Sequence, residues 1–183
     1  MSKQRQGYTL IEILVALAIF SILLGYSIIN LRGTDDRDKV RLTTDKIASL
    51  VRTARNAGFN GVPHPSLGVF PTGGYGVYFN RPSKQYIYFA DINNNDAYAA
   101  DEMLESFTLD SSLTMSLAGD IAIQSMVIIF NGDAPPVVKN AGSGLPILTS
   151  RQIDVSGPSG CSGRTTLSDD DGPLFVEAIF TNC

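Results

Sequence analysis

The pattern of apolar and polar positions changes twice along the chain. From Tyr8 to Ile29 the residues form an unbroken apolar run, in which Glu12 is the only side chain charged at neutral pH. At a rise of 1.5 Å per residue, these roughly 22 residues make a helix of about 33 Å, close to a hydrocarbon thickness of about 30 Å. The run therefore predicts a helix long enough to cross a membrane.

A second pattern, typical of an amphipathic helix, extends from Asp36 to Ala57. Apolar residues recur there mainly every three or four positions, with polar residues between them: Val40, Leu42, Ile47, Leu50, Val51 and Ala54. Thr34 and Asp35 suit an N-terminal cap, and Gly58 suits a helix end. Gly33 suggests a bend or a break between the two helical stretches. We expect the apolar side chains to form a core against a sheet.

After Gly58 the chain changes to short apolar stretches and period-two alternation, with most of its 9 prolines and 17 glycines between them. This pattern predicts strands at 75–80, 85–90, 104–109, 113–117, 126–131, 152–155 and 174–180. Arg81-Pro82-Ser83 predicts a hairpin turn between the first two strands. One long helix followed by strands predicts an α+β fold, with the helix packed on an antiparallel β-sheet.

The apolar run is preceded by a short charged stretch and begins with a distinctive junction, Gly7-Tyr8-Thr9-Leu10-Ile11-Glu12. This junction resembles the N-terminal signal of the type IV pilin superfamily, which includes the pseudopilins of type II secretion. The resemblance implies cleavage between Gly7 and Tyr8, methylation of the new amine on Tyr8, and assembly into filaments through the helix. It divides the chain into a leader (1–7), a transmembrane and assembly helix (8–30), an amphipathic continuation of that helix (31–57) and an extracytoplasmic β-rich domain (58–183).

Glu12 is the candidate assembly residue. A carboxylate in hydrocarbon costs about 2.5–3.5 kcal/mol on insertion scales, so an ionisable residue there indicates a function. A cleavable secretory signal is a poor alternative, because the apolar run exceeds the usual h-region of about 7–15 residues and offers no small-residue cleavage site. An ordinary signal anchor stays open, although it leaves Glu12 unexplained.

Location and partners follow from the same resemblance. Basic residues flank the apolar run on both sides, so charge counting alone does not orient the helix. Prepilins keep the leader in the cytoplasm and place the domain outside the cytoplasmic (inner) membrane, before the subunit enters a filament in the periplasm or at the cell surface. The implied partners are the prepilin peptidase, other pilins or pseudopilins, and the inner-membrane assembly platform.

Three stretches of the domain resemble the H-type minor pseudopilins and related minor pilins. They are Gly-Tyr-Gly-Val-Tyr-Phe at 74–79, Phe-Ala-Asp-Ile-Asn-Asn-Asn at 89–95, and Val-Ile-Ile-Phe at 127–130. This resemblance implies a low-abundance, non-enzymatic structural subunit near the filament tip. The choice between a secretion, pilus or competence machine stays open.

Two rival functions find little support in the composition. A net charge of −4 and a pI near 4.9 argue against nucleic acid as a partner. A DNA-uptake minor pilin with a basic tail would require Lys or Arg near its C-terminus, but none follows Arg164. A membrane-anchored hydrolase needs a catalytic group, but the only histidine, His64, lies between two prolines, where a surface or packing role is expected.

The glycines at 73–76 precede a strand and predict a turn, not a phosphate loop. The run Asp169-Asp170-Asp171 predicts a solvated acidic loop.

The two cysteines, Cys161 and Cys183, both fall in the part expected outside the cytoplasm. An even pair in an oxidising compartment predicts a disulfide bond rather than a metal or catalytic site. Such a bond would tie the last predicted strand to the rest of the domain.

The stretch from Asp91 to Glu102 fits the calcium loop D-x-[DN]-x-[DN]-G-x5-E, except that Asp96 stands at the glycine position. The calcium ligands would be Asp91, Asn93, Asn95, the backbone carbonyl of Ala97, and Glu102. Because predicted strands flank this loop, it is not a helix-flanked EF-hand. Calcium binding and a plain Asn-rich turn both stay open.

Overall fold

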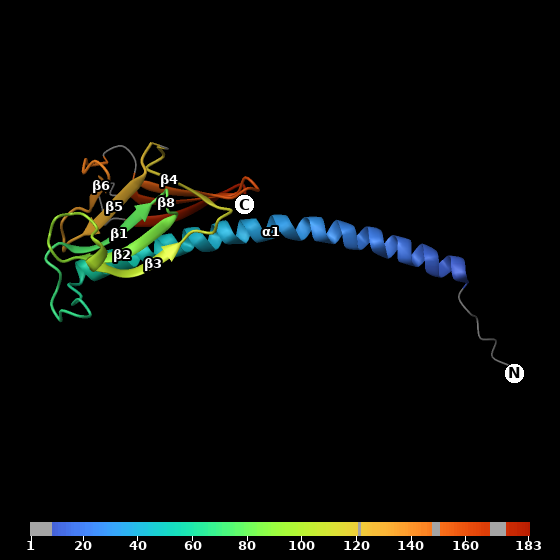
Figure 1. Cartoon of the computed structure of the whole chain (residues 1–183), viewed down its shortest axis with the longest axis horizontal. Helices are drawn as coiled ribbons and strands as arrows, with labels where there is room; N and C mark the ends of the chain where they lie inside the picture. Colours follow the sequence, from blue (N-terminus) through green and yellow to red (C-terminus); the bar gives the residue numbers. More distant parts are fainter. Residues whose placement is uncertain (1–8, 121, 148–150, 169–174) are drawn as a thin grey trace.

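The computed structural model describes residues 9–120, 122–147, 151–168 and 175–183, without the side chains of 27–34, 168 and 175. Within these ranges one long helix precedes nine strands. The helix is α1 (Leu10–Phe59), and the elements after it are β1 (Gly74–Asn80), β2 (Gln85–Asp91), the 3-10 helix η1 (Ala100–Glu102), β3 (Met103–Thr108), β4 (Thr114–Leu117), β5 (Ser125–Phe130), β6 (Val137–Asn140), β7 (Gln152–Ser156), β8 (Ser162–Ser168) and β9 (Phe175–Thr181). Figure 1 shows the second half of α1 against the strands and its first half projecting far beyond them.

The two helical stretches of the sequence form one helix. The backbone of α1 stays helical through Gly33, in line with the continuation at 31–57 that the resemblance implied, so the alternative of a break there and the cap at Thr34 and Asp35 are wrong. The helix also continues through Gly58 and ends at Phe59. Gly61 follows with φ 63°, and the N–H of Val62 donates to the Ala57 carbonyl at 3.0 Å, which is a Schellman ending.

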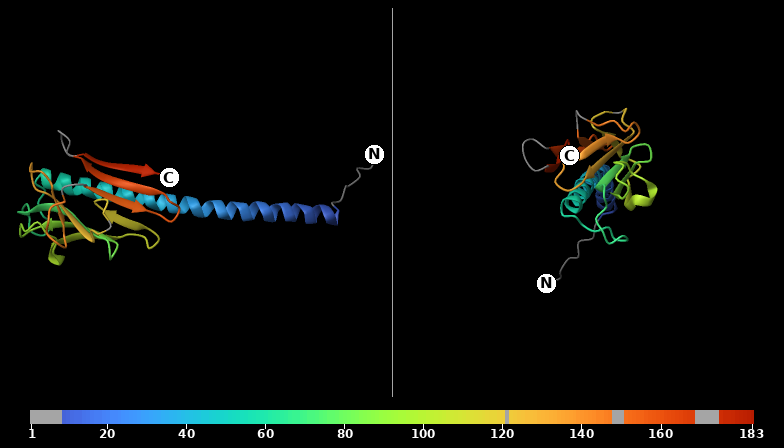
Figure 2. Two further views of the ribbon diagram at one scale, coloured as in Figure 1. Left: turned by 90° about the horizontal axis from the view of Figure 1, so that it is seen from above. Right: turned by 90° about the vertical axis from the view of Figure 1, so that its left-hand side faces the viewer.

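The α+β class is confirmed, with two antiparallel sheets in place of one. Sheet A has the order β3-β2-β1-β5-β6, and sheet B has the order β4-β7-β8-β9. After β3 the chain passes from sheet A to sheet B, where β4 pairs with β7. The predicted turn at 81–83 is confirmed, since Asn80 pairs with Gln85 across it. Figure 2 shows α1 running along both sheets.

The second half of α1 forms the centre of the core. Val40, Ile47, Val51 and Ala54 are fully buried, as the periodicity predicted. Leu42 is the exception, with 71% of its surface exposed. It stands two positions after Val40, about 200° further round the helix, and therefore points away from the sheets.

Small residues bring the helix and the strands into direct contact. A Cβ built on Gly58 would meet the Phe130 carbonyl of β5, and one on Gly163 of β8 would lie 2.9 Å from the Cβ of Thr44. Glycine at these two positions thus allows α1 to approach both sheets.

Two strands escaped the sequence prediction. The stretch Ser162–Ser168 is mostly small and polar, and only Leu167 in it is a large apolar residue. Val137–Asn140 follows two prolines that predict a turn. Both segments pair as strands because a neighbouring strand is available, β7 and β9 for the first and β5 for the second.

Candidate functional site

The first half of α1 carries the candidate processing and assembly residues. Gly7 and Tyr8, the predicted cleavage pair, lie outside the described residues. Thr9 caps the helix, and its hydroxyl oxygen accepts a hydrogen bond from the Glu12 N–H at 3.3 Å. Glu12 is exposed in the first helical turn, where the helix dipole favours a negative charge. The pattern Thr-x-x-Glu is a capping signal that was visible in the sequence and that the prediction did not use.

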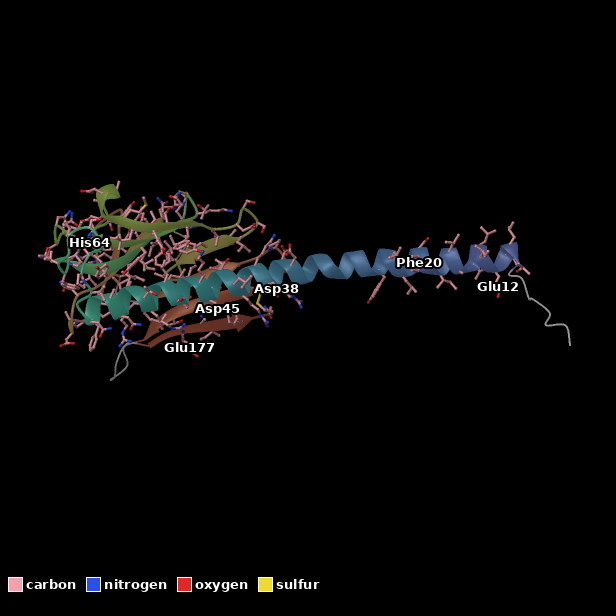
Figure 3. All side chains as sticks on the ribbon, turned by 90° about the horizontal axis from the view of Figure 1, so that it is seen from below. Glu12, Phe20, Asp38, Asp45, His64 and Glu177 are labelled. Carbon is pink, nitrogen blue, oxygen red and sulfur yellow. A yellow bond between two sulfur atoms is a disulfide. The ribbon has the colours of Figure 1, made fainter. Side chains whose placement is uncertain are left out.

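The described side chains of this half, up to Tyr26, are mostly apolar and exposed, and the half projects beyond the domain (Figure 1). Its large apolar side chains are 48–78% exposed from Leu10 to Tyr26. Glu12 lines a shallow apolar groove with Ile13, Ala16, Leu17 and Phe20, and Figure 3 shows Glu12 and Phe20 on this projecting part. Soluble monomers rarely leave so much contiguous apolar surface uncovered, which indicates that something covers it in the functional state.

Over the described residues, no helical segment combines the length and the hydropathy that a membrane span requires.

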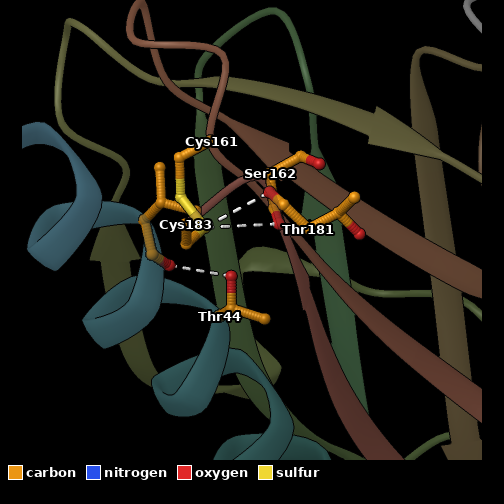
Figure 4. The surroundings of a disulfide bond; sticks show 6 residues. Thr44, Cys161, Ser162, Thr181 and Cys183 are labelled. Atoms are coloured by element: carbon orange, nitrogen blue, oxygen red, sulfur yellow. Dashed lines mark hydrogen bonds between the residues drawn. A yellow bond between two sulfur atoms is a disulfide. The ribbon is translucent and has the colours of Figure 1, made fainter.

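The disulfide between Cys161 and Cys183 is present, with the two Cα atoms 4.8 Å apart. Cys161 is fully buried just before β8, and Cys183 follows β9, which pairs with β8 along its length. Figure 4 shows the bond beside Thr44 of α1. At the other end of β9, the Arg52 guanidinium of α1 donates to the Val176 carbonyl at 2.7 Å. The last strand is thus fastened at both ends.

The structure brings both ends of the proposed calcium loop together. Asp91 ends β2 and is fully buried, and its carboxylate accepts hydrogen bonds from the N–H groups of Asn95 at 3.2 Å and Asp96 at 2.9 Å. Glu102 is 1% exposed and accepts from the N–H groups of Ile92 at 3.1 Å and Ala99 at 3.0 Å. Both Asp91 oxygens and the Glu102 Oε2 accept one of these bonds each, so each keeps a lone pair that could face a cation, whereas the Glu102 Oε1 also accepts from the Asn93 N–H.

The other proposed ligands are less well placed. The side-chain oxygen of Asn95 already accepts a hydrogen bond from the Ala97 N–H at 2.8 Å. The hydrogen bond described for Asn93 uses its backbone N–H, which lies 3.5 Å from the Glu102 carboxylate. Asp96 adopts φ 55°, so the left-handed turn expected at the glycine position does form. Over the described residues no group of three or more His, Cys, Asp or Glu side chains is arranged to hold a metal. Calcium binding stays a prediction.

Two contacts that the sequence did not reveal also hold this loop. The Lys139 ammonium of β6 lies 2.6 Å from the Asp96 carboxylate. The Tyr98 ring stacks on Tyr78 of β1 at 4.8 Å and meets the edge of Phe89 at 5.5 Å. The loop therefore covers the face of sheet A that is turned away from α1.

His64 has the contacts of a packing residue. It is 8% exposed, and its Nδ1 accepts hydrogen bonds from the N–H groups of Ser66 and Leu67. In a Ser-His-Asp triad, Nδ1 instead donates to a carboxylate. The expected turn lies at 71–74, where the Gly74 N–H donates to the Pro71 carbonyl at 3.0 Å, and Gly74 and Gly76 belong to β1. The acidic run at 169–171 lies outside the described residues.

Many basic side chains bond within the domain. Lys39 lies 3.3 Å from Asp35, Arg164 lies 2.6 Å from Asp154, and Lys84 donates to the Ser111 and Leu113 carbonyls. Lys46 and Arg41 lie over the rings of Phe107 and Phe180. These cations are engaged internally and do not make up a basic stripe for phosphates.

Comparison with known families gives one match. The prokaryotic N-terminal methylation motif matches residues 2–28. The match fits a type IV pilin-like or pseudopilin subunit, a class that assembles with other pilins after processing by prepilin peptidase. No curated protein and no solved structure matched the chain.

Breaking the disulfide should loosen β9 first. We expect the double variant Cys161→Ala and Cys183→Ala to lose roughly 3 kcal/mol of unfolding free energy, the value for closing a loop of this length in the chain-entropy model. Chemical denaturation of the detergent-solubilised chain measures the loss. In the unmodified chain without reductant, both thiols should resist an alkylating reagent, and alkylation of both would show that the bond is absent.

Proposed function

We propose that this chain is a non-enzymatic structural subunit of a type II secretion pseudopilus or a type IV pilus. The observation that carries the proposal is the exposed apolar half of α1, which holds one carboxylate and begins inside a matched methylation motif. Such a helix covers its surface either in a lipid bilayer or against the helices of neighbouring subunits. Before assembly it anchors the chain in the cytoplasmic membrane, with the domain outside the cytoplasm.

Within this class, we propose a minor subunit of the H type. The three stretches that resemble those subunits belong to β1, to β2 with the loop after it, and to β5. These strands are neighbours in sheet A, so the resemblance concerns one continuous part of the domain.

The charge on Glu12 supplies a mechanism for assembly. Cleavage after Gly7 would create a positively charged amine on Tyr8, and an amine and a carboxylate are each costly in hydrocarbon. When the amine of one subunit meets Glu12 of another, the two charges compensate each other. This pairing favours one axial position of a subunit relative to its neighbour.

DNA uptake is the second candidate function and has less support. The basic side chains that carry described contacts are bonded to carboxylates, carbonyls or aromatic rings of the same domain. A phosphate-binding surface would have to break these contacts.

Processing is the first test of the proposal. In a host with an active prepilin peptidase, intact-mass analysis should show a chain that lacks residues 1–7 and carries a methyl group on Tyr8. The same chain made in a peptidase-deficient strain should keep its full length, which is the control. A full-length mass in both hosts would contradict the proposal.

Glu12→Ala should be processed and inserted like the unmodified chain but should enter filaments poorly, because the amine of its neighbour loses its counter-charge. Quantitative blotting of sheared filaments measures the incorporation. Ser21→Ala is the matched control, since Ser21 is a polar residue of the same exposed half whose hydroxyl bonds to the Leu17 carbonyl of its own helix. Incorporation of the Glu12→Ala variant equal to that of the unmodified chain would remove the proposed role of Glu12.

We also propose that the loop from Asp91 to Glu102 binds calcium. Its support is that two buried carboxylates, Asp91 and Glu102, lie at the base of one loop. Buried charges need compensation, and a hard cation with oxygen ligands would provide it. Asn93, Asn95 and the Ala97 carbonyl would complete the ligand set.

Calcium at about a hundred times its dissociation constant should then stabilise the chain by roughly 2.7 kcal/mol. Thermal melts of the full chain in detergent, with calcium and then with chelator, measure the shift. Asp91→Asn keeps an acceptor for one of the two loop amides and lowers the ligand charge, so it should reduce the shift between calcium and chelator. Asp101→Asn changes an exposed side chain of the same loop and should leave the calcium-dependent shift unchanged. Identical midpoints with and without calcium would leave the loop as an Asn-rich turn.

A further inference from the structure

The loop at 61–70, between α1 and β1, is organised around a single imidazole. Besides its two bonds at Nδ1, to the N–H groups of Ser66 at 3.2 Å and Leu67 at 3.3 Å, His64 bonds through its backbone to Val69 at 2.8 Å and Gly68 at 2.9 Å. His64 is also almost completely buried. The loop therefore depends on one residue for four of its hydrogen bonds, two of which use the imidazole.

This loop forms one wall of a groove of about 750 Å³. The opposite walls are α1 and the edge strand β3, and Tyr75 and Tyr88 lie in the floor. The Tyr75 hydroxyl donates to the Val62 carbonyl at 3.0 Å, and the ring of Phe70 lies 6.0 Å from that of Tyr75. The position of the loop thus determines how open the groove is. Figure 3 shows His64 on the domain, at the end far from Glu12.

The hydrogen bonds identify the protonation state that the loop requires. Nδ1 accepts from two N–H groups, so Nδ1 carries no proton and the proton of the neutral ring is on Nε2. Adding a proton at Nδ1 turns this acceptor into a donor, which then faces two other donors. The charged ring cannot keep either bond.

Other charged and titratable side chains line the groove. Lys46 of α1 and Glu105 of β3 line the groove with opposite charges. Burial raises the pKa of Tyr75, and burial with the nearby Tyr75 and Glu105 raises the pKa of Tyr88 to about 12, so both phenols stay neutral. Histidine is the side chain that ordinarily titrates between about pH 5 and pH 8.

We propose that His64 is a proton-sensitive latch for the loop at 61–70. The neutral imidazole holds the loop closed over one side of the groove, and the imidazolium releases it. The latch belongs to the domain alone and does not require the filament proposal. It makes the groove between α1 and β3 more open in acid than at neutral pH.

The tautomer gives the first test, and the chain's single histidine makes the signal unambiguous. In the untagged, detergent-solubilised full chain at about pH 8, ¹⁵N NMR of the ring should show Nδ1 as the unprotonated nitrogen. A ring protonated on Nδ1 at that pH would overturn the proposal, whatever any variant does.

Amide hydrogen exchange gives the second test. From about pH 8 to about pH 5, the protection factors of the Ser66 and Leu67 amides, corrected for intrinsic exchange, should fall roughly tenfold. The Lys84 amide, bonded to the Arg81 carbonyl at 3.1 Å, should keep its protection and serves as the internal control.

His64→Asn is the matched variant. The asparagine side-chain oxygen can accept from the N–H groups two and three residues on, as Nδ1 does, but it does not take up a proton in this range. In this variant both amides should stay protected in acid. Unchanged protection in the unmodified chain, or an equal loss in His64→Asn, would overturn the proposal.

Discussion

The structure depends on the close packing of α1 against two sheets at once. Glycines stand where the helix and the strands approach most nearly, Gly58 opposite Phe130 and Gly163 opposite Thr44. The apolar residues of the second half of α1 then fill the space between the sheets. Because that half is fixed in the core and the backbone is helical throughout, the first half is held out from the domain as a continuous rod.

This arrangement places carboxylates in two different environments, one buried in the domain and one exposed on the projecting helix. Asp91 and Glu102 are buried and take hydrogen bonds from backbone amides of their own loop. Glu12 is exposed on an apolar rod, and no described contact involves its side-chain oxygens. A charge that the fold itself leaves unpaired in apolar surroundings is available to a partner molecule, which is why assembly is the function that best fits this residue.

The rest of the domain is held by contacts between segments far apart in the sequence. The Cys161–Cys183 bond and Arg52 hold the last strand on the domain, and among the described side chains of that strand only Val176 is buried. Lys139 and Tyr98 do the same for the loop after β2. In each case one or two specific contacts stabilise a short segment that buries few of its own described side chains.

The sequence alone determined the features that depend on local pattern. The single-charge apolar run, the buried stripe of α1, seven of the strands and the cysteine pair were all predictable, because period, turn residues and parity of cysteines are visible in a linear chain. The resemblance at 7–12 is likewise a local signal, and the matched motif at 2–28 agrees with it.

Only the tertiary structure decided how these pieces meet. It decided between a continuous helix and a break at Gly33, and it alone showed that Leu42 is exposed and that β8 is a strand, because burial and pairing depend on what the opposite surface offers. Only the tertiary structure likewise showed that Lys139 pairs with Asp96 and that the His64 Nδ1 accepts from the Ser66 and Leu67 N–H groups. Periodicity indicates which side of an element is buried, but pairing and close approach depend on residues that are far away in the sequence.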